Sequence, residues 1–310
     1  MSLRLEFDSA TAAAEGFRGV GLGVQAVQLE SGSLDGVLEV GQQGSVLFLR
    51  SYLRARTLFT GDKMPGYRPF CWMSGGGSSY FQAGTSSGGE LCGFMDGRNE
   101  AHCHFNGVLN IIYLREDYFK GYFLANRAFK ALDRVESCDK LPISPQLLTS
   151  AQALMEKGLQ GELADEHQVY SLITTALEEP QDVVRGLADC KNVESLHRLV
   201  ELAHETASGE PLSLSEVCKM LLVSRSTLSA ACKESYGLSV GSLLRMVRLE
   251  QCRIALREGS SVTEVMKRYR FTNRGHFARY YKAAFGELPS VARTTQLTLY
   301  GPDFPGVVAA

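Results

Sequence analysis

One pattern of about 25 residues occurs twice in the last third of the chain. The first copy runs from Leu214 to Gly237 and the second from Val262 to Gly286. Each copy has an apolar periodicity of about 3.6, a short break and a closing glycine, which together predict two short helices joined by a tight turn. The repeat therefore predicts two helix-turn-helix units in an all-α region. The positions that fall in step are Val217 and Val265, Lys219 and Lys267 and, after one extra residue in the second copy, Leu228 and Phe277, and Lys233 and Lys282.

The segments around the repeats complete a helical domain. Glu216 follows Ser213 at the spacing of a capping box, so we expect a helix to begin there. One long amphipathic helix is expected between the copies, where it would hold the two units at a fixed separation. We place the C-terminal domain at 191–296, with the first unit at about 212–237, the linker helix at about 239–258 and the second unit at about 262–286; residues 297–310 form a tail.

The charges of the chain are divided unevenly. Residues 195–295 contain 15 Lys and Arg against 9 Asp and Glu, whereas the whole chain has 32 against 34. A basic domain on an acidic body is the asymmetry expected when only one domain contacts a polyanion.

The N-terminal part, residues 1–190, differs from the C-terminal domain in composition and in expected secondary structure. From about 17 to 115 it combines β-branched and aromatic residues with frequent glycine, which favours many short strands. After about 116 we expect helices over 116–132, from Pro145 onward and over 166–179. The helix from Pro145 carries an apolar stripe that faces either its own domain or a second copy of the chain; its residues are Leu147, Leu148, Ala151, Leu154 and Met155.

Composition excludes several classes of protein. No apolar run approaches the roughly 20 residues that a bilayer requires, and the N-terminus lacks the pattern of a signal peptide. The eight cysteines are scattered without a Cys-x-x-Cys pair, which is typical of unpaired thiols in a reducing compartment. We therefore expect a cytoplasmic protein, associated with the nucleoid if it binds DNA, and no membrane partner.

The second copy carries a specific resemblance. The stretch VTEVMKRYRFTNRGHFARYYKAAFGELPSVAR resembles the DNA-binding domain of the AraC/XylS family of bacterial transcription regulators, and the likeness extends over about 195–293. The residues that carry it are Phe271, His276, Phe277, Tyr281, Lys282, Gly286 and Pro289. The chain departs from the family pattern where Cys232 replaces Phe, Ala230 replaces Arg or Gln, Val240 replaces Pro, Met266 replaces Ala and Arg270 replaces the turn Gly.

The resemblance implies an α+β protein of two domains, with a cupin-like N-terminal sensor or dimerisation domain. It implies a sequence-specific transcription regulator, more often an activator, that binds promoter DNA and contacts RNA polymerase. The implied protein is a homodimer without enzymatic activity or cofactor. Its input is a small-molecule effector or a protein partner, whose identity and binding residues the sequence leaves unknown.

The second helix of each unit is expected to enter the major groove and present its first residues to the bases. Arginine is suited to guanine, whereas serine discriminates weakly, so the second unit has the stronger chemistry for base recognition. Phosphate contact is the competing role for each basic residue. The candidate DNA-binding residues are Arg225, Ser226, Ser229, Lys233, Arg274, His276, Arg279 and Lys282.

Two other interpretations of the N-terminal domain stay open. His102 and His104 could point to the same side of a strand and hold a metal, which would make the protein a metal-dependent cupin enzyme fused to a DNA-binding module. They are weak candidates, because the only carboxylates nearby are Glu90, Asp96 and Glu100. Alternatively, the N-terminal domain dimerises only and binds no ligand.

Overall fold

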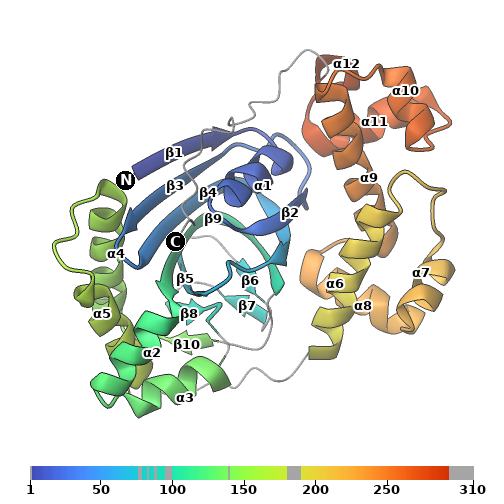
Figure 1. Cartoon of the computed structure of the whole chain (residues 1–310). Coiled ribbons are helices and arrows are strands. Elements are labelled where there is room, and N and C mark those ends of the chain that lie inside the picture. Colours follow the sequence, from blue (N-terminus) through green and yellow to red (C-terminus); the bar gives the residue numbers. More distant parts are fainter. Residues whose placement is uncertain are drawn as a thin grey trace.

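The computed structural model describes residues 2–75, 79–81, 84–86, 89–94, 100–138, 140–179 and 190–292. In these residues, a curled antiparallel sheet with five helices forms the N-terminal part, and seven helices form the C-terminal part (Figure 1). The prediction of a β-rich region followed by an all-α region is confirmed.

The sheet has ten strands in the described residues, with the path β1-β3-β4-β9-β5-β8-β10; β2 pairs with β4, and β6 pairs with β7 and β9. The strands are β1 (Ser2–Phe7), β2 (Gly23–Gln28), β3 (Gly36–Gln43), β4 (Val46–Asp62), β5 (Tyr67–Ser74), β6 (Ser79–Phe81), β7 (Gly84–Ser86), β8 (Glu90–Cys92), β9 (Glu100–Arg115) and β10 (Lys140–Pro142).

Strand β4 organises this sheet. Its first half pairs with β3 and its second half with β2, while β9 runs along its whole length. The register with β9 shifts between Leu53 and Thr57, and such an irregularity increases the local bend of a strand. The curled sheet thereby acquires two buried faces, one packed on α1 (Ala10–Gly19) and the other on the helices that follow β9.

The helices after β9 are α2 (Glu116–Ala125), α3 (Phe129–Ser137), α4 (Pro145–Gln160) and α5 (His167–Glu178). The segment 116–132, expected to be helical, is helical except for a turn between α2 and α3, where Arg127 has a φ of 57°. Helix α1 was not predicted; its buried face consists mostly of alanine, whose small side chain is a weak sequence signal of an amphipathic helix.

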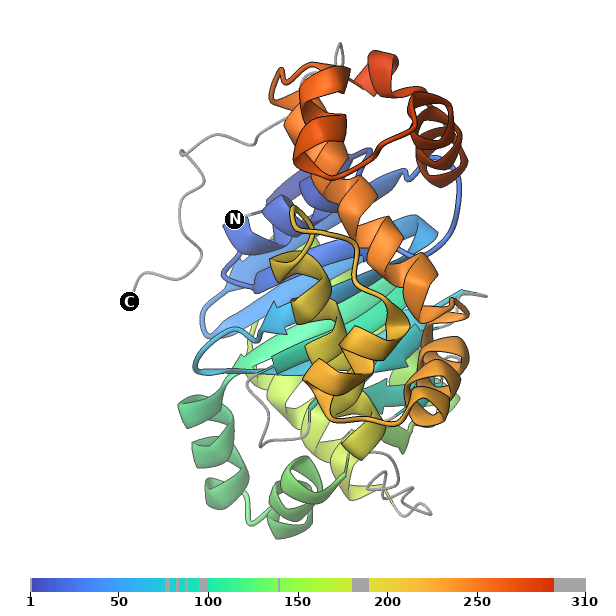
Figure 2. The same ribbon diagram turned by 90° about the vertical axis from the view of Figure 1, so that its right-hand side faces the viewer.

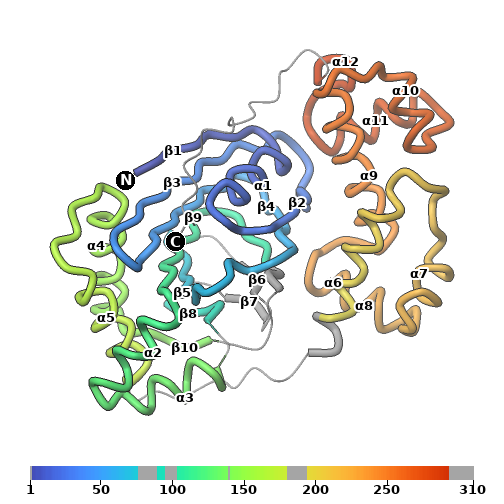
Figure 3. Tube along the Cα trace, in the orientation of Figure 1, coloured from blue at the N-terminus to red at the C-terminus, as the bar shows by residue number. Residues whose placement is uncertain are grey.

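The apolar stripe of α4 packs on its own domain. Ala151 and Met155 are buried in the core that α4 shares with α5 and the sheet. Gly158 lets the helix approach closely, since a Cβ at this position would lie 2.5 Å from the ring of Phe48. The stripe therefore faces its own domain, which was the first of the two interpretations. Helices α4 and α5 lie on the side of the sheet away from the C-terminal helices (Figure 3).

The C-terminal helices are α6 (Cys190–Glu205), α7 (Leu214–Leu221), α8 (Arg225–Tyr236), α9 (Val240–Arg257), α10 (Val262–Arg268), α11 (Arg274–Phe285) and α12 (Pro289–Ala292). They lie together against one side of the N-terminal part, and α9 crosses from one repeated unit to the other (Figure 2). Across the described part of the chain, no helix combines the length and the apolar character needed to cross a lipid bilayer.

Each repeated unit has a hydrophobic core of its own. Leu228, Cys232 and Tyr236 of α8 pack with α6 and α7 in the first unit. Phe277 and Tyr281 of α11 pack with α10, α12 and the last turns of α9 in the second. Both units are thus folded bodies that share α9.

Candidate nucleic-acid interface

Both units begin with a capping box. Ser213 accepts a hydrogen bond from the backbone of Glu216 at 3.3 Å, and Glu216 accepts one from the backbone of Ser213 at 2.8 Å. Ser261 and Glu264 repeat the arrangement at 3.2 and 2.8 Å. These bonds satisfy backbone N–H groups that the first turn of a helix leaves without partners, so α7 and α10 begin at defined residues.

The turns of the two units share one left-handed residue, although the second turn is longer. Leu222 and Arg270 occupy equivalent positions and have φ values of 55° and 59°. Left-handed backbone costs a non-glycine residue roughly 1 kcal/mol, which explains why glycine is the family's usual residue at the position of Arg270. The turn forms in spite of this cost because the core on either side of it is well packed.

The second helix of each unit is also fixed at both ends. Ser224 caps α8 by accepting from the backbone of Thr227, and Asn273 caps α11 by accepting from the backbone of His276 at 2.9 Å. Gly237 and Gly286 end the helices in left-handed conformation, with φ values of 71° and 76°. Both α8 and α11 therefore have stable first turns, the part of a recognition helix that contacts bases.

The candidate DNA-binding residues of the first unit differ in solvent exposure and in whether they already have a hydrogen-bond partner. Arg225 and Ser226 are exposed in the first turn of α8, and Ser229 is half-buried one turn later. Lys233 lies in the last turn, where its Nζ donates to the carbonyl of Gly237 at 3.0 Å. Lys233 thus has a structural partner at the helix end, while Arg225 has a long donor available to a ligand.

In the second unit Arg274, His276, Arg279 and Lys282 are all exposed on α11. Asn273, and not His276, supplies the helix cap, so the His276 side chain is not committed to that role. The guanidinium of Arg279 lies 5.4 Å from the ring centre of Tyr280, a contact that restrains its direction. The second unit therefore displays more donors on its recognition helix than the first.

Comparisons with known proteins agree with this geometry. Residues 217–295 match a family model described as a helix-turn-helix domain. A XylDLEGF operon transcriptional activator from Pseudomonas putida is 31% identical over 104 residues, which is 32% of this chain and 32% of that protein. A second activator of that operon from the same organism is 28% identical over 132 residues, covering 41% of this chain and 83% of that protein. The C-terminal domain is an AraC/XylS-type domain.

Two solved structures are similar to this chain at low sequence identity. The AraC-like transcriptional activator CuxR is 15% identical, with a TM-score of 0.43 over 86% of this chain and 99% of that chain. ToxT from Vibrio cholerae is 13% identical, with a TM-score of 0.31 over 79% of this chain and 96% of that chain. The sequence match to the first P. putida activator spans only about a third of that relative.

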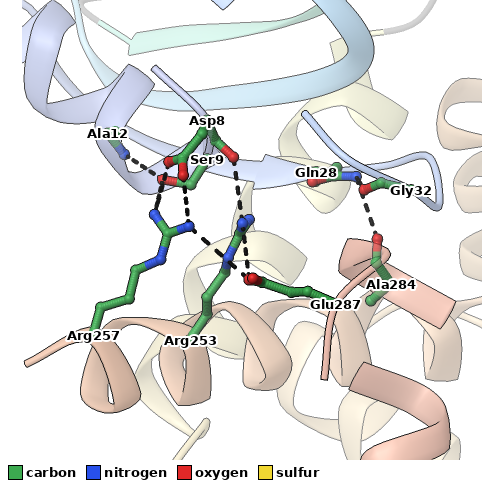
Figure 4. Close-up of polar contacts among 9 residues, drawn as sticks. All are labelled: Asp8, Ser9, Ala12, Gln28, Gly32, Arg253, Arg257, Ala284 and Glu287. Atoms are coloured by element: carbon green, nitrogen blue, oxygen red, sulfur yellow. Dashed lines mark hydrogen bonds and ion pairs between the residues drawn. The ribbon is translucent and has the colours of Figure 1, made fainter. Parts of the chain in front are cut away.

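A contact between the two parts of the chain that the sequence did not reveal holds the AraC/XylS-type domain in place (Figure 4). Arg257 of α9 donates from Nη1 to Asp8 Oδ1 at 2.8 Å and from Nη2 to Asp8 Oδ2 at 2.9 Å. Arg253 donates to the Asp8 carbonyl at 3.3 Å and pairs with Glu287 at 3.2 Å. Partial burial acts to raise the pKa of Asp8, but Arg257 and Arg253 hold it below its ordinary value. The two domains are thus joined by a charged network around Asp8.

A second group of contacts surrounds Gln28 at the end of β2. Its backbone N–H donates to Glu250 Oε1 at 3.3 Å, and its side-chain amide donates to the carbonyl of Ala284 at 3.3 Å. The backbone N–H of Gly32 donates to the same carbonyl at 3.0 Å. Burial raises the pKa of Glu250, against the opposing effect of Arg253. This group connects the sheet to α9 through Glu250. It also connects the sheet to the C-terminal end of α11 through Ala284 (Figure 4).

A third group reaches the first unit. Arg56 Nη2 donates to the carbonyl of Tyr236 at 3.1 Å, and His104 Nε2 donates to the carbonyl of Ser235 at 2.6 Å. Leu29 and Leu58 of the N-terminal part belong to the core of the first unit. The N-terminal part therefore contacts the C-terminal ends of both recognition helices as well as the helix that links them.

The residues considered as metal ligands have other partners or lie outside the described residues. His104 is buried and bonded to the first unit, and Glu90 is within 3.6 Å of Lys140. His102 lies in β9, but its side chain is outside the described residues, as are Asp96 and the side chain of Glu100. Within the described residues, no three His, Cys, Asp or Glu side chains are grouped as metal ligands.

The position of His104 predicts a dependence on pH. Burial, with the nearby Arg56 charge, lowers its pKa to about 4 from 6.5. Its contribution to stability is therefore complete above pH 6.5 and is lost as pH falls toward 4, by roughly 2 kcal/mol at pH 5. We expect the melting temperature to fall between pH 7.5 and 5, and to fall less steeply in His104→Gln than in the wild type.

The exposed His276 provides the control, since His276→Gln should retain the pH dependence of the wild type. Burial also lowers the pKa of His204 to about 4, so part of the dependence should persist in His104→Gln. Equal slopes in His104→Gln and wild type would contradict the assignment to His104.

Proposed function

We propose that this protein is a sequence-specific DNA-binding transcription regulator that activates its promoters and is controlled through its N-terminal domain. The observation that supports this most is the pair of independently packed helix-turn-helix units on one helix, α9, with the first turns of α8 and α11 exposed. Two adjacent major-groove segments, about 34 Å apart, would be contacted by one molecule.

The proposed DNA contacts come from both recognition helices. In α8 they are made by Arg225, Ser226 and Ser229, with Lys233 close to a phosphate. In α11, Arg274 and Arg279 contact bases or phosphate, with His276 and Lys282 beside them. The division of the chain at about residue 190 is part of the proposal, as are a homodimer, contact with RNA polymerase, a cytoplasmic location and the absence of enzymatic activity.

Control through the N-terminal domain has its own structural support. The contacts of Asp8, Gln28 and His104 reach α9 and both units, so a change in the N-terminal domain would alter how the two units are held. The effector is a small molecule or a protein partner in this proposal. The engagement of His104 with Ser235 weakens the alternative of a metal enzyme.

The function is tested by selecting bound sequences from a random duplex library and measuring affinities for them. We expect Arg274→Ala to cost about 1–3 kcal/mol and to flatten the preference at one base pair, because a bidentate contact to guanine contributes about this much. Lys282→Ala, one helix turn from the C-terminal end, should weaken all sequences alike. Failure to select any sequence would contradict the proposed function, whereas a uniform loss in Arg274→Ala would assign Arg274 to phosphate.

A further inference from the structure

A pocket of about 250 Å³ lies between the two helix-turn-helix units. The end of α6, the segment before α7, the first half of α9 and the turn between α10 and α11 form its walls. Three of its lining residues are arginines, Arg245, Arg248 and Arg270, and apolar side chains such as Leu244 and Phe271 stand beside them. The pocket is therefore small, partly apolar and positively charged.

The arginines have little negative charge to balance them. Arg270 lies 3.4 Å from Glu210, and both side chains are more than half exposed. Arg245 lies 4.7 Å from the ring centre of Tyr280. Arg248 is half-buried and makes no hydrogen bond or ion pair with the described residues. Burial lowers its pKa from the ordinary value, against smaller opposing effects of Cys252 and Glu210. A half-buried guanidinium without a direct hydrogen bond or ion pair is unfavourable, so an anion in the pocket would be stabilised.

The backbone at Arg270 gives an independent indication. Its left-handed conformation favours glycine, yet the residue here is an arginine whose side chain lines the pocket. Leu222, at the equivalent position of the first unit, has the same backbone shape and is 88% exposed. Local backbone preference does not select arginine at this position, whereas a ligand with negative charge would.

The pocket opens on the side of α9 that the N-terminal domain leaves uncovered. With about 100° between successive residues of a helix, Arg248 lies on the face of α9 opposite Glu250 and Arg257. Glu250, Arg253 and Arg257 of α9 all make polar contacts with the N-terminal domain. That domain also holds the C-terminal ends of α8 and α11, and the first turns of those helices remain exposed. The pocket is thus accessible on the same uncovered part of the domain as the recognition residues.

We propose that Arg245, Arg248 and Arg270 bind a backbone phosphate of the DNA strand that passes between the two major-groove segments. This proposal rests on the proposed function, and it assigns phosphate binding to the pocket between the units. A phosphate fits the guanidinium groups, which donate two parallel hydrogen bonds to tetrahedral oxyanions. Bound there, one phosphate would fix the register of both units on the duplex, since phosphate contacts position a protein on DNA.

The experiment uses the full chain and a duplex that it has selected from a random library. Phosphates between the two half-sites are replaced one at a time by neutral methylphosphonates, and affinities are measured for each duplex. We expect one central position, or two adjacent ones, to weaken binding of the wild type by about tenfold, the effect of losing a charged hydrogen bond. The same replacement should weaken Arg248→Gln no further.

Two further measurements separate this role from a structural one. Arg248→Gln should reduce the slope of log affinity against log salt concentration by about 0.9, the effect of one phosphate contact. Arg4→Gln, which removes the same charge from an exposed residue of β1, should leave the slope unchanged. Arg270→Gly should bind DNA more weakly while its melting temperature stays the same or rises, because glycine suits the left-handed turn.

The proposal would be overturned if no central methylphosphonate weakened binding, or if wild type and Arg248→Gln lost affinity equally at each position. It would also be overturned if inorganic phosphate at millimolar concentration raised the melting temperature of the wild type but Arg248→Gln bound DNA normally, since the pocket would then hold a free anion. In each case sequence selection itself would succeed, so the proposed function would stand.

Discussion

Replacement of Phe277 by alanine is expected to destabilise the second helix-turn-helix unit by about 3–5 kcal/mol, the range for truncating a buried phenylalanine. The Phe277 side chain is fully buried, with ring centres 4.9 Å from Phe271 and 5.8 Å from Tyr281. Because the second unit has a core distinct from that of the first, the loss should be confined to α10–α12 and the end of α9. DNA binding should fall to that of the first unit alone.

Hydrogen exchange measured by mass spectrometry checks this expectation. Amides of α10 and α11 should exchange faster in Phe277→Ala, while those of α7 and α8 keep their rates. The matched control is Leu288→Ala, which truncates an apolar side chain of the same unit that is 42% exposed, and should change stability by less than about 1 kcal/mol. Equal acceleration in both units would show that their cores unfold together.

Replacement of Arg257 by methionine is expected to weaken the docking of the two domains by about 3 kcal/mol, the low end of the range for breaking a buried ion pair. The low end applies because the side chain of Arg257 is 3% exposed but that of Asp8 is 54% exposed, so water can solvate the released carboxylate. Methionine retains much of the volume of the arginine stem, which limits the effect on packing.

The amide of Gln28 is a direct reporter, since it donates to Glu250 across the same interface. Its exchange should accelerate by roughly 100-fold in Arg257→Met, and the radius of gyration from small-angle scattering should increase. Arg54→Met removes an exposed ion pair with Asp35 and should change neither quantity measurably. An unchanged exchange rate at Gln28 in Arg257→Met would mean that the apolar contacts of Leu29 and Leu58 hold the domains without the ion pair.

Local signals in the sequence predicted the DNA-binding domain well. Helix caps, the 3.6-residue period and closing glycines act within a few residues, so Ser213, Glu216 and Gly237 could be assigned their places before any tertiary contact was known. The second capping box, Ser261 with Glu264, carries the same signal at the equivalent positions of the repeat. The break in the helical segment 116–132 was missed, because the turn at Arg127 contains neither glycine nor proline.

The contacts between domains could not be predicted. Glu250, Arg253 and Arg257 look like the solvated face of an amphipathic helix, yet their side chains are buried against the N-terminal part. Their partners Asp8 and Gln28 are more than 220 residues away in sequence. A charge pattern alone does not distinguish a residue facing water from one facing an oppositely charged partner.

The sequence by itself determined that this protein carries two helix-turn-helix units on a basic domain, because repeats, caps and turns are encoded by short-range interactions. Only the tertiary structure decided that the N-terminal domain contacts α9 and the C-terminal ends of both recognition helices. It also decided that three arginines line a pocket between the units. The physical reason is that such contacts depend on how whole domains dock, a free-energy balance of buried charge, hydrogen bonds and apolar surface that no local pattern records.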